Sequence, residues 1–326
     1  MKRREFQRRV ITVGAASAIG ATRSVTFIPS PTNDPFKDPA YIRSLATRLA
    51  TNQRENGGIT VLPTASRYFT KIRSLVNSKD IQLQQASAYL ARQIAWTLYD
   101  TRRFDVAQNA ARMALKFAHY AKDNEAQGWA FSLLSKNDID RRRSDWGVKY
   151  AQSGLQLRDV EPAVHAKLNI RLGRSLALLR GQERDAREHV ERALAVEGLS
   201  LFNASEIVEE AGYSFADLGM YDDAYVSLGE AVELLDQWPA LQAYCLGQQA
   251  KTALRAHVQT PGGAWLEMAA DRMFAFARAV PFVSSARVDS QVIDILAATT
   301  QWNKVSVMRA ARDQLREVAP PEPAGS

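Results

Sequence analysis

The sequence is poor in the residues that most often carry chemistry, since its 326 residues include one cysteine and four histidines. The single Cys245 excludes an internal disulfide and any metal or redox site built from paired cysteines. It lies in an apolar stretch, which favours a small buried hydrophobe over a nucleophile. None of His119, His165, His189 and His257 has a histidine or cysteine three or four positions later. Their spacing therefore gives no support for a metal site.

Glycine motifs of nucleotide-binding and acyl-transfer enzymes are also missing. No G-x-S-x-G, phosphate-binding loop or G-x-G-x-x-G pattern occurs between a strand and a helix. The acidic pairs Glu209-Glu210 and Asp222-Asp223 fall in helix and turn settings, where we interpret them as solvated. The sequence predicts a protein that is not an enzyme, with no catalytic residues, no cofactor and no metal.

Excess positive charge is scarce outside the N-terminus. The net charge is +7, but the segment 1–30 holds six basic side chains and one acidic side chain, so five of the seven excess charges lie there. The remainder lacks the distributed basic surface that is typical of nucleic-acid binding. With 46% hydrophobic and 24% charged residues, the composition is that of a folded globular protein. We expect neither a membrane span nor direct sequence-specific DNA binding.

Small and large apolar residues, in contrast, recur at helical spacing. Gly212 and Ala224 are small where two helices would cross, Phe215 and Tyr221 would fill the wedge between them, and Gly219 would permit the turn. This spacing matches the tetratricopeptide (TPR) repeat nearly position for position. The residues that we assign to packing within the repeats are Ala95, Ala107, Ala114, Gly212, Phe215, Tyr221, Ala224 and Ala231.

The pattern recurs along most of the chain. The small residues that begin the last turn of each second helix follow one another at nearly equal intervals: Ala114, Gly154, Ala193 and Ala231. These intervals exceed the usual period of about 34 residues, so the repeats need longer helices or turns. Arg102 stands where a turn glycine is common, and Gly181 fills that position in the third copy. Because no stretch alternates apolar and polar residues, we predict an all-α fold, a right-handed superhelix of TPR-like helix pairs, that is, an α-solenoid.

The chain divides into three parts by composition. Residues 1–40 form a basic, proline-punctuated segment that we expect to be flexible, and residues 319–326 form a short disordered tail. Residues 41–318 form the helical repeat domain. Its first pair is expected at 41–56 and 64–77, with Pro63 opening the second helix, and its cap at 282–299 and 304–318.

The N-terminal segment has two interpretations. The run Arg3-Arg4-Glu5-Phe6-Gln7-Arg8 fits the twin-arginine export pattern, and the mildly apolar stretch at 10–21 that follows is too short and glycine-rich for a membrane span. On this interpretation the protein is exported and acts as a scaffold at the cell surface. The other interpretation comes from a resemblance.

Several segments carry that resemblance: Arg3–Phe6, Val61-Leu62-Pro63 after Gly57-Gly58, and residues 91–100, 107–123 and 284–288. With these segments the chain resembles the C-terminal two-thirds of a large actinobacterial family of regulators, in which a helix-turn-helix domain and an R-R-x-F-L linker precede a TPR-like domain. The resemblance implies a cytoplasmic protein that regulates gene expression or development. Since this sequence has no helix-turn-helix segment, DNA binding is not carried over, and a separate DNA-binding partner would be needed.

The first helix of each TPR pair lines the concave groove, and the register predicts which side chains lie there. These are Tyr89, Arg92, Trp96, Tyr99, Ser132, Lys136, Arg171, Ser175, Tyr213 and Asp217. Our candidates for ligand contact are Tyr89, Arg92, Trp96, Lys136, Arg171 and Tyr213. Aromatic and cationic side chains suit a peptide that carries a carboxylate, although each of them could instead pack against a neighbouring pair. We expect a regulatory or scaffolding protein with a peptide or protein partner, and homodimerisation stays open.

Overall fold

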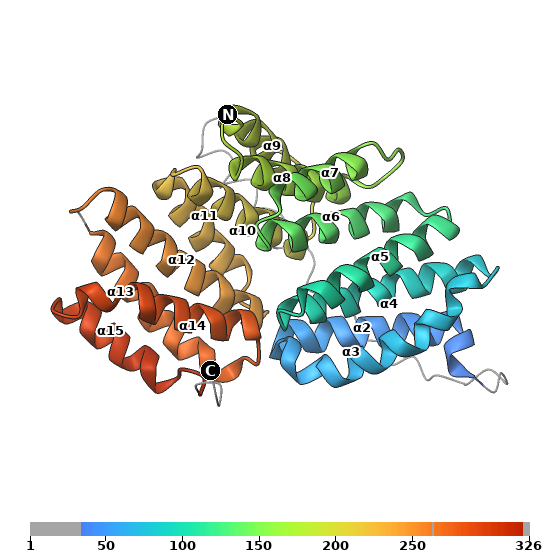
Figure 1. Ribbon diagram of the computed structural model, residues 1–326, viewed down its shortest axis with the longest axis horizontal. Coiled ribbons are helices and arrows are strands. Elements are labelled where there is room, and N and C mark those ends of the chain that lie inside the picture. Colours follow the sequence, from blue (N-terminus) through green and yellow to red (C-terminus); the bar gives the residue numbers. More distant parts are fainter. Residues whose placement is uncertain (1–33, 263, 322–326) are drawn as a thin grey trace.

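The computed structural model describes residues 34–262 and 264–321, and within them every regular element is a helix (Figure 1). Consecutive helices pack as antiparallel pairs, and the pairs stack into the predicted α-solenoid. The export motif at Arg3-Arg4 lies outside the described residues. None of the described helices is long and apolar enough to cross a membrane.

The first pair is α2 (Pro39–Asn56) with α3 (Gly58–Ile72). The five repeats that follow are α4 (Ile81–Asp100) with α5 (Phe104–Tyr120), α6 (Asn124–Asp140) with α7 (Ser144–Leu155), α8 (Pro162–Ala177) with α9 (Glu183–Leu194), α10 (Leu201–Asp217) with α11 (Tyr221–Leu234), and α12 (Pro239–Gln259) with α13 (Trp265–Ala279). The last pair is α14 (Ala286–Ala298) with α15 (Ser306–Glu317). Short 3₁₀ helices lie at Pro35–Lys37, Arg73–Asn77, Val280–Phe282 and Thr300–Trp302.

The turns inside four of the repeats share one backbone conformation. A residue with a positive φ follows the first helix: 58° at Arg102, 60° at Arg142, 77° at Gly181 and 75° at Gly219. These positions recur at the same intervals as the small packing residues. Arginine at a positive φ is uncommon, because a Cβ there crowds the backbone. The turn therefore has the same backbone conformation in the two repeats in which Arg102 and Arg142 stand in place of glycine.

Small residues allow the two helices of a repeat to approach closely. A Cβ placed on Gly212 in α10 would lie 2.7 Å from Cγ of Leu228 and 3.2 Å from the carbonyl oxygen of Ala224, both in α11. Ala224 itself is fully buried, and Phe215 is buried beside it. Tyr221 is half-buried. Other small packing residues are likewise buried: Ala95, Ala107, Ala114 and Ala231.

The N-terminal pair differs from the expected boundaries. Helix α3 begins at Gly58, well before the expected start at 64, and Pro63 lies inside it. Pro63 therefore does not open the helix, and its missing N–H removes one helical hydrogen bond. The break between α2 and α3 comes from Gly57, whose φ is 89°.

The two ends of the solenoid meet, so that α14 lies beside α2 and α3 (Figure 1). The backbone N–H of Ser284 donates to the carbonyl of Asn56 at 2.8 Å, and the N–H of Ile59 donates to the carbonyl of Ser284 at 3.0 Å. A Cβ on Gly57 would lie 2.3 Å from that same Ser284 carbonyl oxygen. Glycine is needed here because of both its positive φ and this close approach.

A buried carboxylate completes this contact. Asp100, the last residue of α4, accepts hydrogen bonds from the backbone N–H of Gly58 at 2.6 Å and from the hydroxyl of Ser285 at 2.8 Å. Ser285 is also the N-cap of α14, because its hydroxyl accepts from the N–H of Val288. We call these contacts among residues 56–59, Asp100 and 284–285 the clasp. It joins the first helix pair of the described chain to the last.

Candidate functional site

The first helices of the five repeats form a continuous layer, since α4 contacts α6, α6 contacts α8, α8 contacts α10 and α10 contacts α12. This layer carries an unusual number of buried polar side chains. They include Lys136 and Asp138 on α6, Lys167 and Arg171 on α8, and Glu210 on α10. Buried charges need partners, so the arrangement of these helices is tied to specific ion pairs.

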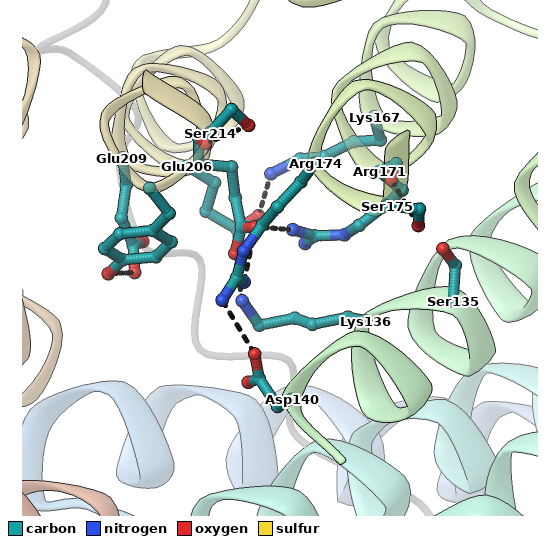
Figure 2. Close-up of polar contacts among 12 residues, drawn as sticks. Ser135, Lys136, Asp140, Lys167, Arg171, Arg174, Ser175, Glu206, Glu209 and Ser214 are labelled. Atoms are coloured by element: carbon teal, nitrogen blue, oxygen red, sulfur yellow. Dashed lines mark hydrogen bonds and ion pairs between the residues drawn. The ribbon is translucent and has the colours of Figure 1, made fainter. Parts of the chain in front are cut away.

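Eight charged side chains of α6, α8 and α10 form what we call the charged cluster (Figure 2). Its cations converge from α6 and α8 on acidic side chains, most of which lie on α10. Its members are Lys136, Asp140, Lys167, Arg171, Arg174, Glu206, Glu209 and Glu210.

Glu210 is the centre of the charged cluster. One of its carboxylate oxygens pairs with Nζ of Lys136. The other lies 2.6 Å from Nη1 of Arg171 and 3.0 Å from Nη1 of Arg174. Arg174 continues to Asp140, whose Oδ1 is 2.8 Å from its Nη2. Burial alone would raise the pKa of Glu210, but the three cations hold it well below its usual value.

Two further pairs extend the charged cluster. Lys167 donates to Glu206, and burial, opposed by this carboxylate, lowers the pKa of Lys167 to about 8. The hydroxyl of Tyr213 donates to Glu209, and burial raises the pKa of that carboxyl. With four cations and four carboxylates, the cluster balances its own charge. The interpretation of Glu209-Glu210 as solvated was wrong, because both are buried. Glu210 pairs with cations of α6 and α8, and Glu209 accepts from Tyr213.

A cavity of about 230 Å³ opens beside the charged cluster. Aromatic rings from three helices form part of its wall: Trp96 on α4, Trp129 on α6 and Phe202 on α10. Further arginines enter from outside the cluster: Arg54 on α2, Arg92 on α4 and Arg287 on α14. The first pair, the repeats and the C-terminal cap thus all contribute to one wall.

Four of the six groove candidates line this cavity, namely Arg92, Trp96, Lys136 and Arg171. Tyr89 lies outside it, in a neighbouring cavity of about 490 Å³ that Arg92 also lines. Tyr213 lies at a third cavity of about 490 Å³, together with Arg174, Arg255 and Arg287. Arg287 therefore stands between the first cavity and the third.

Two of the three cationic candidates are buried, whereas we expected them to be exposed. Arg171 is 1% exposed and Lys136 is 3% exposed, and both are already paired with Glu210. Tyr99 and Ser175, which the register also placed on the surface, are fully buried. Tyr99 donates its hydroxyl to Asp140, and Ser175 donates to the carbonyl of Arg171 within its own helix.

The register missed four of the cavity's larger side chains. Arg54 precedes the repeats and Arg287 follows them, so neither belongs to a helix whose inner face the motif predicts. Trp129, the sixth residue of α6, and Phe202, the second residue of α10, were not among the positions that the register assigned to the groove. The one sequence signal at Arg287 is that it lies in the segment 284–288, which carries part of the family resemblance.

The fold and its inner layer place this chain among helical-repeat proteins of the α-solenoid class. No protein-family model and no curated protein sequence matches it. Solved structures do match, and among them is the crystal structure of the apo form of RapI. The two chains are 12% identical, with a TM-score of 0.50 over 85% of this chain and 97% of that chain. At this identity the likeness shows the shared fold.

Proposed function

We propose that this protein is a non-enzymatic regulatory or scaffolding protein that binds a peptide or a partner protein on the inner face of its solenoid. The carrying observation is the cavity beside the charged cluster, where aromatic and cationic side chains from α2, α4, α6, α10 and α14 meet. Such residues provide large contact area and oriented hydrogen bonds, which are the features of binding hot spots. The solved structure of RapI supports the fold on which the proposal rests.

The likeness to actinobacterial regulators favours a role in gene regulation through a separate DNA-binding partner. The fold itself does not determine the process, because helical repeats serve many functions. The export motif at Arg3-Arg4 favours a second candidate, a scaffold at the cell surface. Intact mass of the protein from its native cells separates the two, since export predicts the loss of about 20 residues and a cytoplasmic regulator keeps them.

Two tryptophans provide a matched test of the binding surface. Trp96 is half-buried at the cavity, whereas Trp146 is 51% exposed on α7, away from it. A partner captured with the purified protein should bind Trp96→Ala about tenfold or more weakly, because truncating an aromatic anchor costs about 2 kcal/mol. Trp146→Ala should bind as the wild type does. A partner whose affinity is unchanged by Trp96→Ala and Trp129→Ala, in variants that keep their helical circular dichroism, would place the working surface elsewhere.

A further inference from the structure

Three arginines of the cavity have no carboxylate partner. Arg54, Arg92 and Arg287 form no ion pair with any described residue. Each lies over aromatic rings instead. Arg54 is 3.9 Å from the Phe202 ring centroid. Arg92 is 5.0 Å from that of Trp129.

Arg287 is the most enclosed of the three. Its guanidinium carbon lies 3.6 Å from the ring centroid of Tyr244 and 4.6 Å from that of Tyr99. Its Nη2 is buried with no hydrogen-bond acceptor among the described residues. A buried guanidinium nitrogen without an acceptor is costly, because the hydrogen bonds that it made with water are lost.

The cavity therefore has an excess of positive charge. Six cationic side chains line it, but only two carboxylates, Glu206 and Glu209. The cations Lys136, Lys167 and Arg171 are matched by acidic residues of the charged cluster. The excess positive charge therefore belongs to Arg54, Arg92 and Arg287.

Two of the arginines, Arg54 and Arg92, disfavour one another. Burial lowers the pKa of Arg92, and the nearby charge of Arg54 lowers it further, while Tyr89 and the carboxylates of Glu206 and Glu125 act in the opposite direction. Both carboxylates are engaged elsewhere: Glu206 with Lys167, and Glu125 with the indole N–H of Trp129. An anion that enters the cavity would relieve this repulsion and supply the missing acceptors.

We propose that the cavity is an oxyanion site in which Arg54, Arg92 and Arg287 bind a carboxylate or phosphate group. Guanidinium groups present paired N–H donors that match the oxygens of such anions, which is the chemistry that the unpaired nitrogens require. Where the carboxylate belongs to a bound peptide, the inference rests on the proposed function. Where the anion is a small molecule, it stands without that function.

The first test is thermal unfolding of the full chain with inorganic phosphate or succinate, compared with sodium chloride at equal ionic strength. The wild type should show a saturable rise in Tm, of about 5 °C at concentrations near 100 times Kd. The double variant Arg92→Gln/Arg287→Gln should show no rise beyond that in chloride. The control Arg184→Gln, at a 93% exposed side chain on α9, should respond as the wild type does.

The same variants distinguish binding from a purely structural role. Without added anion, the single variant Arg92→Gln should unfold at a Tm equal to or above that of the wild type, because burial and the nearby charge of Arg54 both disfavour the charged form of Arg92. A lowered Tm would mean that Arg92 acts as a structural group, and would overturn the proposal. So would an anion effect that chloride reproduces or that the double variant retains. If the double variant does not unfold cooperatively, Arg54→Gln, at the half-buried first arginine, provides the same comparison.

A second experiment, with a peptide ligand, tests whether the oxyanion is a carboxylate of a bound peptide. A captured partner peptide should lose about tenfold or more in affinity when its carboxylate is amidated, and the loss should disappear in Arg92→Gln. Arginine-dependent binding of small anions with no peptide partner would refute the proposed function and support the oxyanion site. A peptide that binds equally well to all three arginine variants would support the proposed function and overturn the site.

Discussion

Three cations, Lys136, Lys167 and Arg171, are buried in the inner layer because carboxylates of α10 lie within ion-pair distance of them. Removing two charges from water is expensive, and their attraction roughly repays that cost only in good geometry. The charged cluster therefore adds little net stability compared with apolar packing. We infer that it fixes how α6, α8 and α10 align, because Glu210 can meet Lys136, Arg171 and Arg174 at one relative position of the helices.

The cost of burying Lys167 can be measured from the way in which the free energy of unfolding depends on pH. Its pKa is lowered to about 8, chiefly by burial, whereas an ordinary lysine in the unfolded chain titrates near 10.4. Between these values the unfolded chain binds more protons, so the free energy of unfolding rises with pH. Relative to Lys167→Met, the wild type should gain about 1.4 kcal/mol per pH unit between pH 8 and 10.4, or roughly 3 kcal/mol in all.

Urea unfolding of both proteins at pH 7, 8, 9 and 10 measures this difference. Lys149→Met, at an exposed position on α7, serves as the control and should follow the wild type. Parallel profiles for the wild type and Lys167→Met would show that Lys167 does not titrate in this range.

Some residues of the cavity could be predicted from the sequence, whereas their partners could not. The helical register placed Lys136 and Arg171 on the inner faces of α6 and α8, and both line the cavity. It could not predict that Glu210 neutralises them. Register describes one helix at a time, whereas an ion pair depends on the relative position of two helices. Arg54 and Arg287 were missed for the related reason that neither belongs to a repeat.

At the scale of the element, the crossing of α10 and α11 depends on small side chains. We expect Ala224→Leu to lower the free energy of unfolding by about 1–3 kcal/mol, because the added atoms overpack the interface that Gly212 and Leu228 already fill. Thermal or urea unfolding measures the loss. The control Ala310→Leu, at an exposed position of α15, should change stability by less than about 0.5 kcal/mol. Equal effects of the two substitutions would contradict the assigned crossing.

The sequence predicted which segments are helical. It predicted where a helix begins or ends only where the contacts that determine the boundary lie close by in the sequence. The repeat turns are set by residues within them, so the spacing of Gly181 and Gly219 predicted them. The start of α3, at Gly58, was missed. It is determined partly by Ser284, whose carbonyl accepts from Ile59 and whose approach requires Gly57. No local pattern around residue 57 contains that information.

For the whole molecule, the clasp should behave as one cooperative unit. Asp100→Asn replaces a carboxylate that accepts from both Gly58 and Ser285 with an amide that can accept on one side only. Leaving a buried donor unpaired costs about 1–3 kcal/mol. Hydrogen exchange should therefore show that the amides of residues 58, 59 and 284 lose protection together, while those in the middle of α8 keep theirs.

A matched surface change provides the control for the clasp. Asp105→Asn alters a carboxylate that is 83% exposed and pairs with Arg141, so it should leave exchange at residues 58, 59 and 284 unchanged. Loss of protection at one of these amides alone, with the others unaffected, would show that the ends are joined by separate contacts.

A repeat protein with free ends can gain or lose a unit by duplication or deletion, because each unit needs only its neighbours. In this chain the backbone of Gly57 must lie against that of Ser284. The rotations between successive helix pairs must therefore add up to the one value that brings these two residues together. One more helix pair would carry α14 past α2, and one fewer would leave it short. The number of units is thus set by geometry, as the number of blades is in a closed propeller.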